Sequence, residues 1–142
     1  MTVASDRMMQ FLNESVPFHR FIGLQVVEAG GGTAKVTLAF RPEFIGDPQR
    51  PALHGAVLAT LIDVACGAAV LAVIDARDSC STVDFRVDFL RPGQALDLIC
   101  EAKVLRTGSR VAATSAIVHH GNPDEPIADG RAVYNVVRRP AH

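Results

Sequence analysis

Cysteine is scarce in this sequence, and neither sign of charge dominates it. The three cysteines, Cys66, Cys80 and Cys100, form neither a Cys-x-x-Cys pair nor a metal-ligand motif. We interpret them as reduced core thiols of a cytosolic protein, and we expect no metal or other cofactor. The net charge of -1 at pH 7 lacks the basic excess that neutralises phosphates, so nucleic acid is not an expected partner.

We expect no signal peptide, and the sequence lacks an uninterrupted hydrophobic run of membrane-spanning length. Residues 55–74 form the only stretch that is long enough, and Asp63 interrupts it near the middle. The many alanines and glycines around Asp63 suit close packing in a soluble core, so we expect no membrane partner and a cytoplasmic location. Without repeats or low-complexity linkers, residues 1–142 are expected to form one domain with a substantial core.

Hydrophobic periodicity predicts two helices and six strands. A helix is expected over residues 5–13, with Ser5 as its N-cap and an end by Pro17. Residues 82–89 alternate polar and apolar side chains throughout, which predicts a half-buried strand. The other predicted elements are strands over 24–27 and 33–40 joined by a Gly30-Gly31-Gly32 turn, a loop over 41–53, a long helix over 55–74, and strands over 96–105, 110–119 and 127–137. This order predicts an α+β fold in which one antiparallel sheet is covered by a single long helix.

Two features of the long predicted helix point to chemistry. Asp63 lies beside Ile62 and Val64, where an unpaired buried carboxylate would cost on the order of several kcal/mol. Three interpretations of Asp63 follow. It lies on a solvent-exposed edge of the helix, it bonds a backbone N–H or pairs with an arginine, or it is held for catalysis. At the helix entrance His54 precedes Gly55, whose missing side chain leaves backbone N–H groups open to an anion or a developing oxyanion. The alternative for Gly55 is a tight-turn glycine.

The spacing between Gly55 and Asp63 bears on how a site can form. On one continuous helix, eight residues at about 1.5 Å of rise each separate them by about 12 Å along the axis. One reacting carbonyl cannot touch both, because each contact has to lie within about 3 to 3.5 Å. We therefore expect a homodimer whose antiparallel helices share each site. The alternative is a separate site around Asp63 in each chain.

Four short motifs occur in order along the chain. They are Pro17-Phe18-His19-Arg20-Phe21-Ile22-Gly23, then His54-Gly55 with Asp63 nine residues after His54, then Thr82-Val83-Asp84, and finally Phe89-Leu90-Arg91-Pro92-Gly93. Together they resemble the PaaI-like hotdog acyl-CoA thioesterases over nearly the whole chain. The resemblance implies the hotdog fold, an antiparallel sheet wrapped around one long central helix. It also implies hydrolysis of an acyl-coenzyme A thioester to a free acid and coenzyme A, without a metal, by a homodimer that often pairs into a tetramer.

The resemblance also implies roles for individual residues. The carboxylate of Asp63 would act as general base or nucleophile, the Gly55 N–H would polarise the thioester carbonyl, and a hydroxyl at Thr82 would help to place the attacking water. Ser81 is the neighbouring candidate, and both hydroxyls are alternatively ordinary strand-edge groups. His54 either orients its loop through the ring nitrogens or contacts the thioester directly.

Four further residues bear on the expected site. Relatives often carry an asparagine in the loop before the His-Gly pair, whereas this chain has Asp47, so a second carboxylate replaces an amide donor. Arg106 and Arg110 flank a turn and are candidates for binding coenzyme A phosphates, with ordinary surface arginines as the alternative. Cys66 shares a helix face with Asp63, but no histidine is placed in sequence to activate it, and we interpret it as a packing residue.

Two functions of different classes stay open. One is an acyl-CoA thioesterase, and the other is a non-catalytic acyl-CoA-binding hotdog domain, which has no need of a carboxylate at the reacting carbon. A hotdog dehydratase or hydratase is disfavoured, because those relatives place an aspartate and a histidine close together on a different segment. The acyl group depends on the apolar side chains that line the pocket and on how two chains meet.

Overall fold

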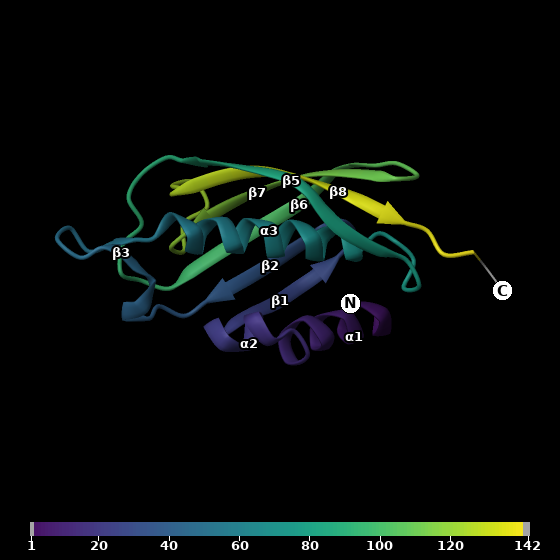
Figure 1. Ribbon diagram of the computed structural model, residues 1–142, viewed down its shortest axis with the longest axis horizontal. Helices are drawn as coiled ribbons and strands as arrows, with labels where there is room; N and C mark the ends of the chain where they lie inside the picture. Colours follow the sequence, from purple (N-terminus) through teal and green to yellow (C-terminus); the bar gives the residue numbers. More distant parts are fainter. Residues whose placement is uncertain (1, 141–142) are drawn as a thin grey trace.

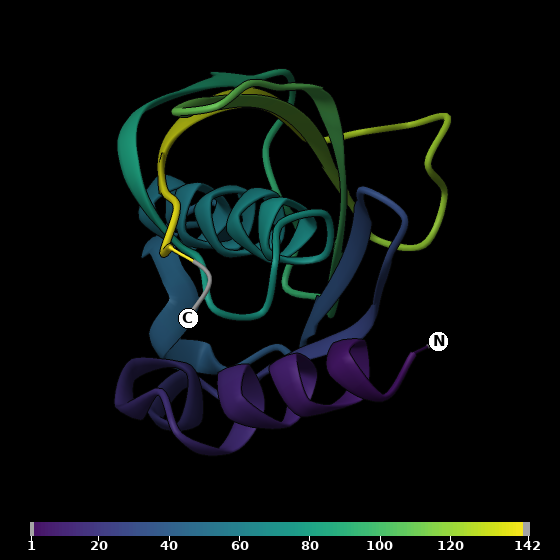
Figure 2. The ribbon, with the colours of Figure 1, turned by 90° about the vertical axis from the view of Figure 1, so that its right-hand side faces the viewer.

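A long helix runs through the middle of the protein, and an antiparallel sheet wraps around it (Figures 1 and 2). The computed structural model describes residues 2–140. Its elements in chain order are α1 (Val3–Glu14), α2 (Pro17–Ile22), β1 (Leu24–Gly30), β2 (Thr33–Leu38), the 3-10 turn η1 (Pro42–Phe44), β3 (Ile45–Asp47), β4 (Ala52–Leu53), α3 (Gly55–Leu71), β5 (Ser79–Phe89), β6 (Leu98–Thr107), β7 (Val111–His119) and β8 (Ala128–Val137). The main sheet has the strand order β1-β2-β6-β7-β8-β5, and all neighbouring strands are antiparallel.

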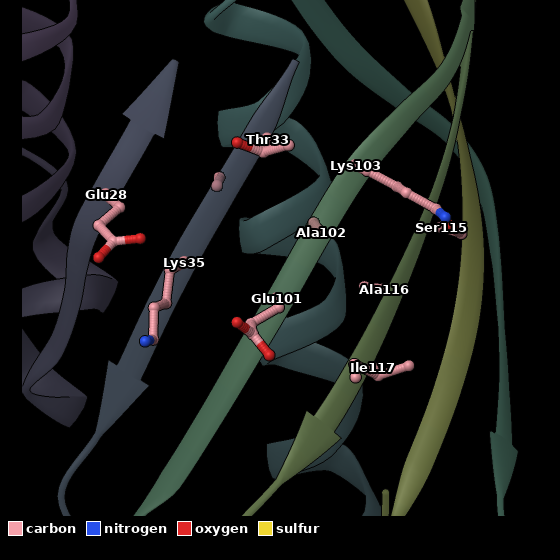
Figure 3. A pocket seen from close by; sticks show the side chains of 10 residues that line it. Glu28, Thr33, Lys35, Glu101, Ala102, Lys103, Ser115, Ala116 and Ile117 are labelled. Carbon is pink, nitrogen blue, oxygen red and sulfur yellow. The ribbon is translucent and has the colours of Figure 1, made fainter. Parts of the chain in front are cut away.

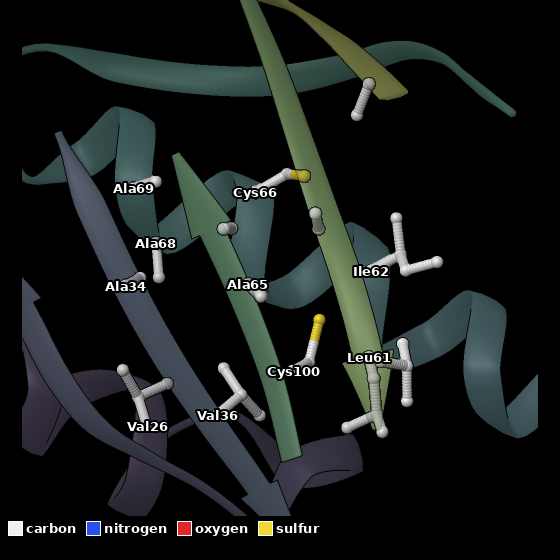
Figure 4. Packing of buried hydrophobic residues seen from close by; sticks show 14 of the residues in the cluster. Val26, Ala34, Val36, Leu61, Ile62, Ala65, Cys66, Ala68, Ala69 and Cys100 are labelled. Carbon is white, nitrogen blue, oxygen red and sulfur yellow. The ribbon is translucent and has the colours of Figure 1, made fainter. Parts of the chain in front are cut away.

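The core lies between α3 and the inner face of the sheet. Figure 4 shows small side chains of α3, such as Ala65 and Ala69, close to the strands that carry Val36 and Cys100. Gly130 on β8 is required for this approach, because a Cβ there would lie 2.7 Å from the Arg86 carbonyl oxygen and 2.9 Å from a methyl carbon of Ile62. One face of α3 is buried against the sheet, whereas Asp63, on another face, is only half-buried.

The predicted architecture is confirmed, since two strands, a long helix and four more strands form one antiparallel sheet around one helix. The glycine turn between β1 and β2 is confirmed as well, with positive φ angles of 60° at Gly31 and 84° at Gly32. The long helix ends at Leu71 rather than at residue 74. Within residues 2–140, no helix is both long and apolar enough to span a membrane.

Several details differ from the predictions. Ser5 is not the N-cap of α1, because the helix begins earlier and the Thr2 hydroxyl accepts the hydrogen bond from the Ser5 N–H. The expected loop over 41–53 contains η1 and the β3-β4 hairpin, and α2 precedes β1. The strand predicted over 82–89 is present within β5, but its predicted half-burial is wrong, since nine of the eleven residues of β5 are exposed. β5 is an edge strand like β1, but within residues 2–140 no element binds its outer side as α1 binds β1.

Candidate active site

Asp63 is held by two hydroxyl groups from neighbouring strands. The Thr82 hydroxyl donates to Asp63 Oδ1 at 2.8 Å, and the Tyr134 hydroxyl donates to the same oxygen at 3.0 Å. The single Tyr134 hydroxyl proton is shared with the main-chain carbonyl oxygen of Asp63, the nearer acceptor at 2.6 Å. Among the hydrogen bonds and ion pairs of residues 2–140, none involves Oδ2. One carboxylate oxygen is therefore held by two hydroxyls, and the other has no hydrogen-bond partner within residues 2–140.

The register of the sheet explains how these side chains meet. Thr82 on β5 pairs directly with Tyr134 on β8, and both side chains point from the inner face of the sheet toward α3. Ser81 pairs with Asn135, and side chains alternate along a strand, so Ser81 points to the opposite face. The structure thus brings Thr82 to Asp63 and leaves Ser81 on the outer face of β5.

The first turn of α3 presents a second set of groups. His54 caps the helix, because its Nδ1 accepts a hydrogen bond from the Ala56 N–H at 3.0 Å. The His54 carbonyl accepts from the Val57 N–H, whereas the Gly55 N–H donates to no group within residues 2–140. The helix N-terminus therefore keeps one free donor at Gly55, where the helix dipole also favours negative charge.

A hollow of about 440 Å³ opens at this helix start. The Phe89 ring packs directly on Gly55, since a Cβ at Gly55 would lie 3.1 Å from the ring. Apolar side chains make up most of the lining, which consists of Leu53, Gly55, Leu58, Phe89, Leu90, Arg91, Pro92 and Gly93. A chain of apolar atoms fits such a wall better than a charged group does.

A different hollow, of about 450 Å³, lies on the outer face of the sheet (Figure 3). Its charged side chains, among them Glu28, Lys35, Glu101 and Lys103, point away from α3. The two signs alternate across neighbouring strands, with Lys35 directly opposite Glu101. This hollow lies on the opposite side of the sheet from Asp63, so it is separate from the groups described above.

Asp47 is the last residue of β3, directly before the turn to β4. Its carboxylate accepts hydrogen bonds from the Gln49 N–H at 3.0 Å and from the Arg50 side chain at 2.8 Å. The Arg50 guanidinium, followed by the Gln49 N–H, holds the pKa of Asp47 below its usual value. The carboxylate therefore stabilises its own turn, and Asp63 is not among its partners in the chain.

Arg106 and Arg110 lie near the β6-β7 turn, at the end of the molecule where β8 ends (Figure 1). Both are exposed. The start of α3 lies toward the other end, beside β3. The structure therefore does not bring these arginines together with Gly55 within one chain.

The cysteines lack the properties of nucleophiles. Cys66 and Cys100 are buried in the core as expected, and Cys80 is half-buried and packs against the core. Burial raises the pKa of Cys66 to about 11 and, with the nearby Asp63 charge, that of Cys80 also to about 11. A thiol with such a pKa stays protonated near neutral pH, which agrees with a packing role for Cys66.

Sequence reasoning missed Tyr134, Phe89 and Gly46. Gly46 lets the β3-β4 hairpin approach the helix start, because a Cβ there would lie 2.7 Å from the His54 Cα. Phe89 belonged to a quoted motif, but its contact with Gly55 depends on where β5 ends. No local signal marks Tyr134, because its link to Asp63 depends on the register between β5 and β8.

Comparison with known proteins places the chain in a family. The family model described as the thioesterase superfamily matches residues 51–127, more than half of the chain. That range contains the helix start, Asp63 and Thr82.

Individual relatives agree with the family match. The chain is 30% identical over 135 residues to the medium/long-chain acyl-CoA thioesterase YigI of Salmonella typhimurium, with 85% of this chain and 86% of the relative covered. A solved structure from Shewanella oneidensis, related to the thioesterase superfamily, is 29% identical with a TM-score of 0.82 and coverage of 93% and 94%. Another solved protein from the thioesterase superfamily is 33% identical, with a TM-score of 0.85 and coverage of 96% and 100%. The chain therefore belongs to the thioesterase superfamily and is a thioester hydrolase with the hotdog fold.

Proposed function

We propose that this protein hydrolyses acyl-coenzyme A thioesters to a free acid and coenzyme A. The observation that carries the proposal is the Asp63 carboxylate, whose Oδ1 accepts from two hydroxyls while Oδ2 has no partner in the described chain. The relatives called YigI are named as acyl-CoA thioesterases, and this name supports coenzyme A as the thiol part of the substrate. A non-catalytic acyl-CoA-binding domain would have no need of a carboxylate placed in this way, so hydrolysis is favoured over binding alone.

The proposed reaction uses the helix start and Asp63 together. The Gly55 N–H donates to the thioester carbonyl oxygen, and Asp63 accepts a proton through Oδ2 from the water that adds to the carbonyl carbon. The carbon–sulfur bond then breaks, the carbonyl re-forms, and the proton passes to the coenzyme A sulfur. Because His54 Nδ1 accepts from Ala56, neutral His54 carries its proton on Nε2, and this N–H can donate to the thioester.

A second copy of the chain is part of the proposal. Gly55 and Asp63 lie on the continuous helix α3, about 12 Å apart along its axis, so one carbonyl cannot touch both. We propose a homodimer in which Gly55 and His54 of one protomer meet Asp63 and Thr82 of its partner. The exposed edge strand β5, with Val83 64% and Phe85 40% exposed, supports this contact.

We further propose medium or long acyl chains as substrates. The name of the YigI relatives supports this range, as does the apolar hollow beside Gly55. Arg106 and Arg110 are proposed to bind coenzyme A phosphates, and Asp47 is proposed to stabilise the hairpin that positions His54. A hydrolysis screen against short, medium, long and aromatic acyl-CoAs tests the substrate range. Equal rates on short and long chains would contradict the chain-length proposal.

Asp63 is the residue whose change tests the function itself. We expect Asp63→Asn and Asp63→Ala to lower kcat on the best acyl-CoA by at least about a hundredfold, the usual scale of general base catalysis. The measurement is release of free thiol from acyl-CoA. Asp124→Asn, an exposed carboxylate outside the proposed site, serves as the matched control and should keep normal turnover. Near-normal turnover of Asp63→Asn would overturn the proposed mechanism.

A mixing experiment tests the shared site. Gly55→Pro removes the N–H at a helix position where proline fits, whereas Gly55→Ala keeps the N–H and makes a similar new contact with Phe89. We expect Asp63→Ala and Gly55→Pro homodimers to be inactive and Gly55→Ala to keep much of its activity. Co-expressed Asp63→Ala and Gly55→Pro chains should regain one working site of two. An inactive heterodimer formed from folded parents, or an active wild-type monomer, would contradict the shared site.

A further inference from the structure

Tyr134 is fixed against both the backbone and the side chain of Asp63. It is the only tyrosine in the chain, and it is 2% exposed. Its one hydroxyl proton is shared between the Asp63 main-chain oxygen at 2.6 Å and Oδ1 at 3.0 Å. One helical turn later, Gly67 has no side chain, and a Cβ there would lie 3.5 Å from the ring of Tyr134. Gly67 therefore lets the Tyr134 ring lie close against α3.

The Tyr134 hydroxyl acts as a donor and not as an acid or base. Burial, followed by the neighbouring charge of Asp63, raises the pKa of Tyr134 far above its usual value. The phenol therefore keeps its proton over the whole working pH range of an enzyme. Because the side chain is buried beneath the helix, a substrate cannot reach its oxygen.

Two donors converge on one oxygen of the carboxylate. Thr82 lies on the exposed edge strand β5, whereas Tyr134 lies on β8 between two paired strands. We propose that Tyr134 is a positioning residue that, together with Thr82, holds Asp63 Oδ1 in place so that Oδ2 is the oxygen that accepts the proton from water. This inference rests on the proposed thioester hydrolysis. It assigns the reacting oxygen and adds a buried residue that no motif marked.

The variant Tyr134→Phe tests the inference, because it removes the hydroxyl and keeps the ring. We expect kcat to fall about 10- to 100-fold, the effect of losing one hydrogen bond to a charged group, while KM stays within about twofold. Thr114→Val is the matched control. The Thr114 hydroxyl is also buried and donates to a β8 carbonyl, that of Ala132, at 2.8 Å, but it makes no hydrogen bond to Asp63. Both variants should lower Tm, and only Tyr134→Phe should lower kcat.

A double variant separates positioning from general destabilisation. With Tyr134→Phe and Thr82→Val combined, Oδ1 has no donor left, so the loss in kcat should exceed the product of the two single losses. A kcat of Tyr134→Phe within about twofold of wild type would overturn the inference. An equal loss of kcat in Thr114→Val, or a rise in KM with unchanged kcat, would overturn it as well.

The single tyrosine also allows a test without a mutation at Tyr134. Growth with 3-fluorotyrosine labels Tyr134 alone, and its ¹⁹F resonance reports on the hydroxyl environment. We expect this resonance to shift in Asp63→Asn and in Thr82→Val, and to stay in place in the exposed control Asp124→Asn. An unchanged resonance in Asp63→Asn would overturn the inference even if Tyr134→Phe failed to fold. An inactive Asp63→Asn with a fully active Tyr134→Phe would leave thioester hydrolysis standing and reject only the role of Tyr134.

Discussion

The two edge strands of the sheet are similar, but one is covered by a helix and the other is exposed. Both edge strands, β1 and β5, contain a bulge, one at Val27 and one at Val83, and both valines are exposed. At the β1 edge, the Asn13 side chain on α1 donates to the Val26 carbonyl at 3.0 Å and accepts from the Val26 N–H at 2.7 Å. At the β5 edge, no described element covers the strand.

The difference supports the β5 edge as the place where the proposed second chain binds. An uncovered edge strand offers free N–H and C=O groups to another strand, and proteins normally block such edges. Here α1 blocks the edge that is far from Asp63, and the edge that carries Thr82 is left open. The open edge and Asp63 thus lie on the same side of the molecule, which supports the proposed dimer.

Placing a charge on the open edge should have the largest effect. We expect Val83→Lys to convert the proposed dimer to a monomer, because a lysine at this position would put a charge into the proposed interface. Activity should fall by at least about a hundredfold, since Asp63 loses the partner's oxyanion donor. Sedimentation velocity and thiol release measure the two losses, and circular dichroism checks that the fold remains.

The covered edge provides the matched control for that variant. Val27→Lys places the same charge at the bulge of β1, where the residue is 42% exposed. It should leave assembly and kcat unchanged. Loss of the dimer in Val27→Lys, or a fully dimeric and active Val83→Lys, would reverse the comparison between the edges.

Removing the cover from the β1 edge should have an intermediate effect. Asn13→Ala takes away both hydrogen bonds to Val26 and leaves two partly buried backbone groups without protein partners. We expect the free energy of unfolding to fall by about 1 to 3 kcal/mol in urea titrations, with assembly unchanged. Gln10→Ala removes an exposed bond to Glu14 on the same helix and should cost less than about 0.5 kcal/mol. Equal losses in the two variants would show that Asn13 does not close the edge.

The sequence was sufficient for elements that depend on local patterns and insufficient for how those elements are covered. The glycine turn before Thr33 and the apolar helix around Asp63 were predicted because backbone freedom and periodicity are local properties. The alternation over 82–89 identified a strand, but the same alternation fits a strand covered by its own chain or by a partner. The burial of β5 therefore could not be predicted from the order of its side chains.

The candidate site shows the same limit. Asp63, Gly55 and His54 were visible because a lone carboxylate and a glycine at a helix start are unusual in sequence. Thr82 came from a motif, and the structure brings it to Asp63. Tyr134 was not visible, because its place beside Thr82 follows from a pairing between strands that are distant in sequence.

The smallest expected effect concerns the start of β5. Asp78 accepts hydrogen bonds from the Arg139 N–H at 2.9 Å and from the Arg138 side chain at 3.0 Å, and so ties the start of β5 to the end of β8. The Arg139 N–H, with the Arg138 guanidinium, holds the pKa of Asp78 below its usual value of 3.8. A lowered pKa in the folded state means that the bond stabilises the protein above pH 3.8, and that this contribution is lost as acid protonates the folded carboxyl. Asp78→Asn should therefore lower Tm by a few degrees at pH 7, and the difference from wild type should shrink below about pH 4. A difference that stays constant from pH 7 to pH 3 would contradict this role for the Asp78 charge.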